Sequence, residues 1–137
     1  MPRGFEILEH TADVGVRAWG DSPEETFEQA TRGLLSITGA VGDQPGVRMD
    51  IEVTATDLAG ALVDWLEEVL YVQDARDSVI TGVAVESATA TGATGWVEAA
   101  SRATDLEGTA VKAITYHQLE VTRDADGIWF ATVFFDI

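Results

Sequence analysis

Residues 78–90 read SVITGVAVESATA, and from this stretch to Ile137 apolar side chains recur at every second position. A period of two is typical of β-strands. Three further segments share it, at residues 95–103, 109–123 and 127–137, and turns containing Gly and Asp separate them. In the last of these turns, RDADG predicts a tight hairpin. The second half of the chain is therefore predicted to be a run of consecutive strands.

The first half adds two helices to this run of strands. Residues 21–39 have a helical period, with Ser22 and Glu25 spaced as a capping box and Gly39 as a stop. Residues 56–75 form the second helix, with an apolar stripe that includes Leu62 and Trp65. Helices segregated from strands predict an α+β fold with a largely antiparallel β-sheet and both helices packed on one face. We expect residues 1–137 to form one domain.

The charge balance excludes one class of partner. Eight Lys and Arg residues stand against 24 Asp and Glu, which gives a formal net charge of −16. Proteins that bind nucleic acid neutralise phosphates with clustered Lys and Arg, so direct RNA or DNA binding is not expected. An acidic surface that serves only solubility is the plain alternative. The absence of cysteine, of a secretory signal in MPRGFEILEH and of a bilayer-length apolar run predicts a cytoplasmic protein without a membrane segment.

The sequence offers little for catalysis by itself. The phosphate-loop, dinucleotide-binding, serine-hydrolase and HExxH zinc motifs are all absent. With no cysteine and only two histidines, nucleophile–base pairs and zinc sites are poorly supplied. A metal-dependent hydrolase would have to use His10 or His117, and no motif supports it.

The most unusual chemistry lies at the end of the sequence, which reads WFATVFFDI. An apolar strand leads directly to Asp136 and to the terminal carboxylate of Ile137. Two carboxylates on an ordered surface repel each other, so a cation is expected to compensate them. Lys112, a bound metal or a basic group from a partner protein could supply that charge. Oxygen-only donors favour hard cations such as Ca²⁺ or Mg²⁺, and Asp13 as a third carboxylate would strengthen the site.

Two further segments carry candidate functional residues. EHTADVG places His10, Thr11 and Asp13 at a break between two strands, where scaffolds often present functional side chains. Turn formation by Thr11 and Asp13 is the alternative interpretation. In VKAITYHQLEV, a regular strand would put Lys112 and His117 on opposite faces.

Taken together, these segments resemble the archease family. The motifs that carry the resemblance occur in order from Phe5 to Ile137: HTADVG, AWGDSPEETFEQA, LVDWLEEVLY, VKAITYHQLEV and the terminal W-x-A-x-V-x-F-D-I. The chain departs from the family pattern in AASRATDLEGTAVKA, where a GE or GEP-like turn is common, and in WLEEVL, where WLNELL is common. The first departure puts loop contacts around residues 101–108 in doubt.

The resemblance implies a specific function. Archeases are small acidic accessory proteins, not enzymes, that activate RtcB-type RNA ligases in tRNA processing, tRNA splicing and RNA repair. They promote attachment of guanylate from GTP to the ligase histidine and so support turnover. The family fold is an α+β domain with two helices against sheet.

The resemblance also implies the site residues. The family metal site, usually described with calcium, maps here to Asp13, Asp136 and Ile137; magnesium or manganese are the other candidates. Lys112 is the further functional position. The remaining candidate partner-facing positions within the same motifs are His10, Thr11, Tyr116 and His117.

Two interpretations of function therefore stand at this point. One is a ligase activator that carries a divalent cation and acts as a monomer or weak oligomer. The other, from a different class, is a general acidic interaction or chaperone-like module that binds basic protein surfaces without metal.

Overall fold

The computed structural model describes residues 3–9 and 13–137. The elements, in chain order, are β1 (Gly4–Glu9), β2 (Asp13–Gly20), α1 (Pro23–Thr38), β3 (Val47–Thr54), α2 (Leu58–Ala75), β4 (Ser78–Thr89), β5 (Gly92–Ser101), β6 (Ala113–Ile114), β7 (Glu120–Arg123) and β8 (Trp129–Asp136).

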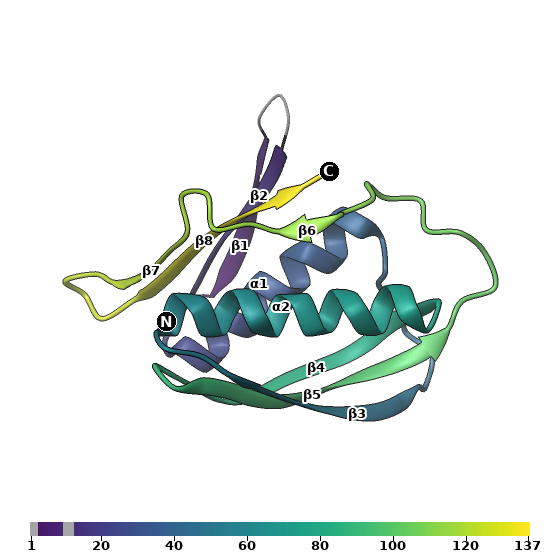
Figure 1. Cartoon of the computed structure of the whole chain (residues 1–137), viewed down its shortest axis with the longest axis horizontal. Helices are drawn as coiled ribbons and strands as arrows, with labels where there is room; N and C mark the ends of the chain where they lie inside the picture. The colour runs from purple at the N-terminus through teal and green to yellow at the C-terminus, as the bar shows by residue number, and fades with distance from the viewer. Residues whose placement is uncertain (1–2, 10–12) are drawn as a thin grey trace.

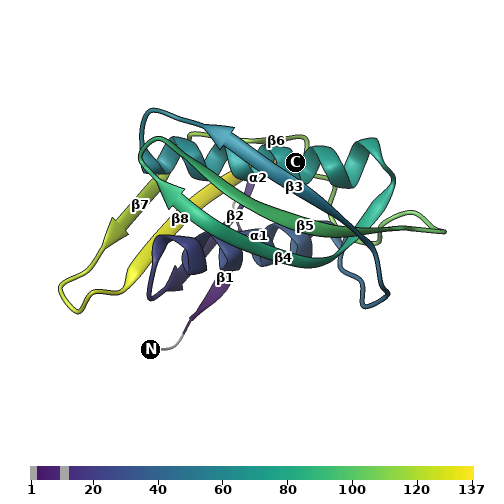
Figure 2. The same cartoon turned by 90° about the horizontal axis from the view of Figure 1, so that it is seen from below.

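The strands form two antiparallel sheets with the helices between them. The five-stranded sheet has the order β1-β2-β8-β6, with β7 also paired to β8, and the three-stranded sheet has the order β3-β5-β4. Helix α1 packs on β1, β2 and β8 of the first sheet and on β4 of the second, while α2 packs mainly on the three-stranded sheet. Figure 1 shows α2 lying across the three-stranded sheet, and Figure 2 shows that sheet in front of both helices. The predicted α+β class is confirmed, and each sheet keeps one face free of helix.

Local capping explains where the helices begin and end. Ser22 Oγ accepts a hydrogen bond from the Glu25 N–H at 3.1 Å, and Gly39 ends α1 in the left-handed region at φ 79°. The Glu25 carboxylate reaches back to the Asp21 N–H at 3.4 Å, one residue earlier than in a standard capping box. Asp57 caps α2 by accepting from the Gly60 N–H at 2.6 Å.

The core lies between the sheets and is built around large side chains of both helices. Trp65 is fully buried, and its indole N–H donates to Thr31 Oγ1 at 3.0 Å, which satisfies the polar atom of the ring. Full burial of one such apolar side chain contributes about 1.5–3 kcal/mol. The other largest fully buried side chains include Phe27, Leu34, Leu62, Leu66, Val16, Val97 and Phe135.

The prediction of one regular strand over residues 109–123 is wrong. The structure has two short strands there, β6 and β7, with a turn between them in which Gln118 has φ 52°. Thr115 Oγ1 donates to the Phe134 carbonyl at 3.0 Å and accepts from the His117 N–H at 3.2 Å. A side-chain hydroxyl that bonds the backbone in this way competes with strand pairing. The Thr115 N–H still donates to the Phe134 carbonyl at 2.9 Å, so pairing with β8 ends after Thr115 and the predicted regular strand does not continue into the turn.

The predicted hairpin at residues 123–127 is confirmed. Gly127 has φ 84°, and its N–H donates to the Asp124 carbonyl at 3.1 Å. One carboxylate oxygen of Asp124 accepts from the Asp126 and Ile128 N–H groups, at 2.8 and 2.9 Å. The turn thus joins β7 to β8 and fixes the start of the terminal strand.

Candidate metal centre

The candidate carboxylates meet in the central strand pair of the five-stranded sheet. Strands β2 and β8 pair antiparallel over eight residues, and this register puts Asp13 opposite Asp136. Side chains alternate between the faces of a strand. In β2, Val14 and Val16 are buried against the helices, so Asp13 points to the helix-free face. Its partner Asp136 is in register with it and points to the same face.

Directly opposed residues in an antiparallel pair have Cβ atoms about 4.5–5.5 Å apart, and like charges at such positions destabilise the pair. Asp13 is half-buried and Asp136 is exposed, and Ile137, 40% exposed, follows at once. Among residues 3–9 and 13–137, neither aspartate takes part in an ion pair. The register therefore places two negative charges opposite each other at the end of the strand pair.

Asp136 is held from both sides. On the side away from β2, it is in register with Ala113 of β6, and its carbonyl accepts from the Lys112 N–H at 2.8 Å. The backbone of Lys112 thus lies next to Asp136, and the Lys112 side chain is exposed.

His117 lies on the same helix-free face, one row along the sheet. Its ring contacts the ring of Phe134 edge-on, with centroids 5.9 Å apart. Phe134 precedes Asp136 by two residues and is in register with Gly15, where an added Cβ would lie 2.7 Å from the Phe134 ring. The turn after Thr115 therefore places the His117 ring against Phe134 of β8.

The other candidate residues differ in position. Tyr116 lies in the same turn and is 66% exposed. His10 and Thr11 lie outside the described residues.

Further along β2 and β8, around the pair Arg17 and Thr132, is a hollow that the sequence did not predict. It has a volume of about 620 Å³, and Arg17, Phe134, Gln118 and Glu120 are among its lining residues. The Arg17 guanidinium lies 5.5 Å from the centroid of the Phe130 ring. Arg17 is an even number of residues from Asp13 in β2, and Phe130 is an even number from Asp136 in β8, so all four side chains lie on the same face of the sheet. This alternation is the sequence feature that could have identified Arg17 and Phe130.

The chemistry of the donor set fits a hard cation. Within the described part of the chain, no group of three or more His, Cys, Asp or Glu side chains converges as a metal cage. The pair Asp13 and Asp136 offers four carboxylate oxygens, and the Ile137 carboxylate would add two. Calcium takes six to eight oxygen ligands and accepts water among them, so three carboxylates completed by solvent or by a partner would suffice.

Comparison with known proteins identifies the family. Residues 5–137 match the family model described as the Archease protein family (MTH1598/TM1083). The chain belongs to the archease family. It is 35% identical to protein archease of Pyrococcus furiosus, over 98% of this chain and 99% of that protein. It is 36% identical to protein archease of Thermococcus gammatolerans, over 94% of this chain and 95% of that protein.

Two solved structures share the archease fold. The solution structure of Methanobacterium thermoautotrophicum protein 1598 matches with a TM-score of 0.77 and 28% identity, covering 98% of this chain and 99% of that chain. The crystal structure of a Thermotoga maritima archease, described as a possible chaperone, matches with a TM-score of 0.64 and 24% identity, covering 96% of each chain. The second likeness concerns the fold alone. In the described residues of the present archease, no helix has the length and apolar character needed to cross a membrane.

Proposed function

We propose that this archease is a non-enzymatic accessory protein of an RtcB-type RNA ligase, and that it promotes guanylylation of the ligase in tRNA splicing and RNA repair. Membership of the family supports the partner class. The observation that carries the proposal is the in-register pairing of Asp13 with Asp136. Two like charges fixed on neighbouring strands are costly unless a cation shares them, so the pair is suited to holding one.

In this proposal Asp13, Asp136 and the terminal carboxylate of Ile137 hold a divalent cation, with calcium as the first candidate and magnesium or manganese as the others. When bound, the cation supplies positive charge that can stabilise phosphate oxygens. The strands supply the positioning, because β2 and β6 fix Asp136 from both sides. This end of the sheet would dock at the nucleotide pocket of the ligase and align the GTP phosphates for attack by the ligase histidine.

Two neighbouring side chains have roles in the same proposal. Lys112, whose backbone bonds to Asp136, would contact phosphate or an acidic group of the ligase. His117, packed on Phe134, would contact the ligase surface with Tyr116, which is exposed in the same turn. With a net charge of −16, the protein would act on RNA through the ligase in the cytoplasm, as a monomer or weak oligomer, without binding RNA itself.

The test is a guanylylation assay with the cognate ligase and GTP, with and without this protein. Asp13→Asn and Asp136→Asn keep the shape of each side chain and remove its charge, and each should abolish the stimulation. Glu52→Gln is the matched control, because Glu52 is exposed on β3 of the other sheet. All three variants should keep a native circular dichroism spectrum. Full stimulation by both aspartate variants would refute the proposal.

A chaperone-like or general interaction module is the second candidate, and the acidic composition, with a net charge of −16, favours it. Such a module would bind many basic proteins in a salt-sensitive way, because exposed charges are screened by salt. Its binding to them would also be equally strong with and without a metal chelator. Stimulation of the ligase that requires a divalent cation discriminates between the two candidates.

A further inference from the structure

The edge of the three-stranded sheet is covered by a row of side chains from α1. Figure 2 shows α1 running alongside β4. The Glu24 carboxylate accepts from the Ala88 N–H, and the Glu28 carboxylate accepts from the Val85 N–H, each at 2.9 Å. Glu24 and Glu28 are one helical turn apart, so they follow the strand edge together. These two carboxylates satisfy outward backbone donors that an edge strand would otherwise expose.

The other end of the β4 edge is covered by the chain segment after α1. Val41 forms a parallel bridge with Ile80, in which the Ile80 N–H donates to the Ala40 carbonyl at 2.8 Å and the Gly42 N–H donates to the Ile80 carbonyl at 3.3 Å. The protein thus adds a short extended segment of its own to this edge. This bridge shows that the β4 edge can form backbone hydrogen bonds with an added extended segment.

Between these two covered stretches the edge is open at Val83. The backbone groups of alternate residues in an edge strand point away from the sheet. The backbone N–H groups of Ile80 and Val85 point away from the sheet. The bulge between Ile80 and Gly82 inserts one extra residue, so the alternation also turns the backbone N–H and carbonyl of Val83 outward. In the part of the chain that the structure describes, no turn or loop backbone group and no side chain bonds the Val83 N–H or carbonyl. The next member of the α1 row, Arg32, has no acceptor to offer that N–H.

A groove lies at this opening. It has a volume of about 340 Å³, and its wall is mainly apolar, with Phe5 from β1, Leu35 from α1 and Val41 among the lining residues. Val41 is 60% exposed. Arg32 is the single charged residue among the described residues that line the groove. An open edge, an apolar wall and one cation therefore coincide.

We propose that this groove binds an extended peptide segment of a partner protein, with apolar side chains against the groove wall and one carboxylate side chain opposite Arg32. One peptide residue would pair with the open N–H and carbonyl of Val83, as in β-strand addition. The Arg32 charge selects an acidic residue in the bound segment. This site is separate from the proposed carboxylate centre, and neither depends on the other.

A second copy of the chain fits this edge less well. The open stretch lies between Ile80 and Val85, and pairing with a whole strand would displace both Glu28 and residues 40–42. A small apolar molecule would leave the Val83 backbone groups unused. The short open stretch and the single cation favour a peptide over both.

The probe is an acetylated and amidated heptapeptide of alternating valine and serine with one central aspartate. Titration into ¹⁵N-labelled protein should shift the Val83 amide resonance and slow its hydrogen exchange. Arg32→Glu extends the acidic row of α1, so it offers the Val83 N–H an internal acceptor and repels the peptide; binding should weaken about tenfold or more. Arg76→Glu makes the same charge change at an exposed position after α2 and should leave binding unchanged.

Two peptide variants separate the contributions. A lysine in place of the central aspartate should weaken binding about fivefold. An N-methyl group on the amide that pairs with Val83 should abolish binding, because β-strand addition needs that donor. Equal affinity for the methylated peptide, shifts confined to the Asp136 region, or a dimer in sedimentation that excludes the peptide would each overturn the proposal. Stimulation of the ligase is not measured here, so the outcome is independent of the proposed function.

Discussion

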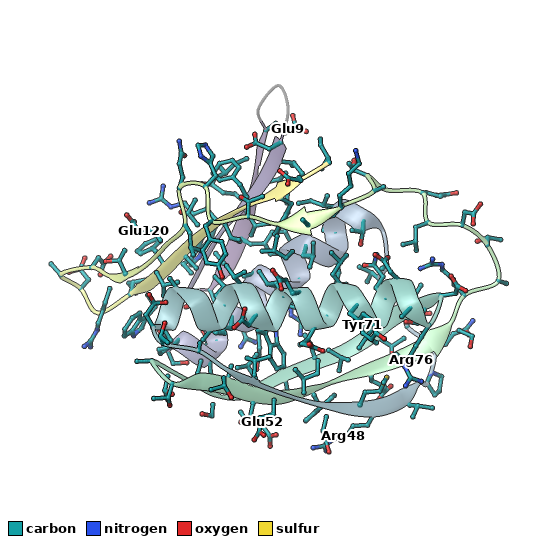
Figure 3. The ribbon with its side chains drawn as sticks, viewed as in Figure 1. Glu9, Arg48, Glu52, Tyr71, Arg76 and Glu120 are labelled. Carbon is teal, nitrogen blue, oxygen red and sulfur yellow. The ribbon has the colours of Figure 1, made fainter. Side chains whose placement is uncertain are left out.

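The two sheets each leave one face free of helix, and they arrange charge on it in opposite ways. On the three-stranded sheet, Arg48 Nε lies 3.2 Å from Asp50 Oδ1, and its guanidinium lies 4.9 Å from the centroid of Trp96. On the five-stranded sheet, Asp13 opposes Asp136, a residue of the same sign. Figure 3 shows Arg48 and Glu52 on one side of the molecule and Glu9, at the end of the five-stranded sheet, on the opposite side.

The two faces therefore differ in how their charges are balanced: on one face opposite charges pair with each other, whereas on the other face two like charges require a cation from outside. Arg48 and Asp50 neutralise each other, and such an exposed pair contributes little to stability. The backbones of Asp13 and Asp136 are held opposite each other at the end of eight consecutive residue pairs. Strand register, more than acidic composition, marks the candidate site.

The largest expected effect is a calcium response confined to the five-stranded sheet. At a calcium concentration about 100 times the Kd, binding should raise the free energy of unfolding by about 2.7 kcal/mol. One glycine added after Ile137 displaces the terminal carboxylate and should remove most of this gain, whereas Glu52→Gln should keep it. Thermal denaturation with and without calcium measures the response. An unchanged response in the extended chain would show that the terminal carboxylate is not a ligand.

The second prediction compares two glycines on the helix-free faces. A Cβ at Gly15 would lie 2.7 Å from the Phe134 ring and 2.8 Å from the Val133 carbonyl oxygen, whereas a Cβ at Gly82 would lie 3.5 Å from its nearest neighbours. Gly15→Ala should therefore lower the free energy of unfolding by about 2 kcal/mol, and Gly82→Ala should change it by less than about 0.5 kcal/mol. Urea denaturation checks both. Equal effects would contradict the close packing of Phe134 on β2.

Much of this arrangement follows from local sequence pattern. The period of two assigns Asp13 and Asp136 to the polar faces of their strands, and the caps at Ser22 and Asp57 fix the starts of the helices. The class of fold was predictable because these patterns are local.

The remainder depends on contacts between distant residues. The sequence pattern cannot give the register that opposes Asp13 and Asp136, which are separated by most of the chain. At the break after Ile114, the Thr115 hydroxyl bonds the Phe134 carbonyl, a partner 19 residues away. The turn that follows brings the His117 ring against Phe134. The covering of β4 by Glu24 and Glu28 is tertiary in the same way.

The third prediction is that removing one carboxylate charge changes the free energy of unfolding in opposite directions on the helix-free faces of the two sheets. With all divalent metal chelated, Asp136→Asn removes like-charge repulsion and should raise the free energy of unfolding by about 0.5 kcal/mol. Asp50→Asn removes an attraction to Arg48 and should lower it by at most about 0.5 kcal/mol. Both changes should shrink at high salt, because screening weakens exposed interactions. Urea denaturation at two salt concentrations measures them. A loss of stability in Asp136→Asn would mean that the aspartate has a stabilising partner.

The smallest expected effect is at Glu67 on α2, where like charges are neighbours on a helix and not on two paired strands. Partial burial, together with the neighbouring carboxylates of Asp64 and Glu68, raises the pKa of Glu67 on α2. A carboxyl group whose pKa is higher in the folded than in the unfolded state lowers stability where it is ionised, and this penalty disappears as the pH falls through the folded-state pKa.

Glu67→Gln should therefore raise Tm by about 1 °C near neutral pH, and the gain should vanish at acidic pH. Glu side chains on a helix surface are longer and can separate further than two Asp side chains on opposed strand positions, so the gain in Glu67→Gln should be smaller than that in Asp136→Asn without metal. Melting curves recorded between acidic and neutral pH measure the effects of Glu67→Gln and of Asp136→Asn. A larger effect at Glu67 would show that strand register does not concentrate charge more strongly than a helix surface does.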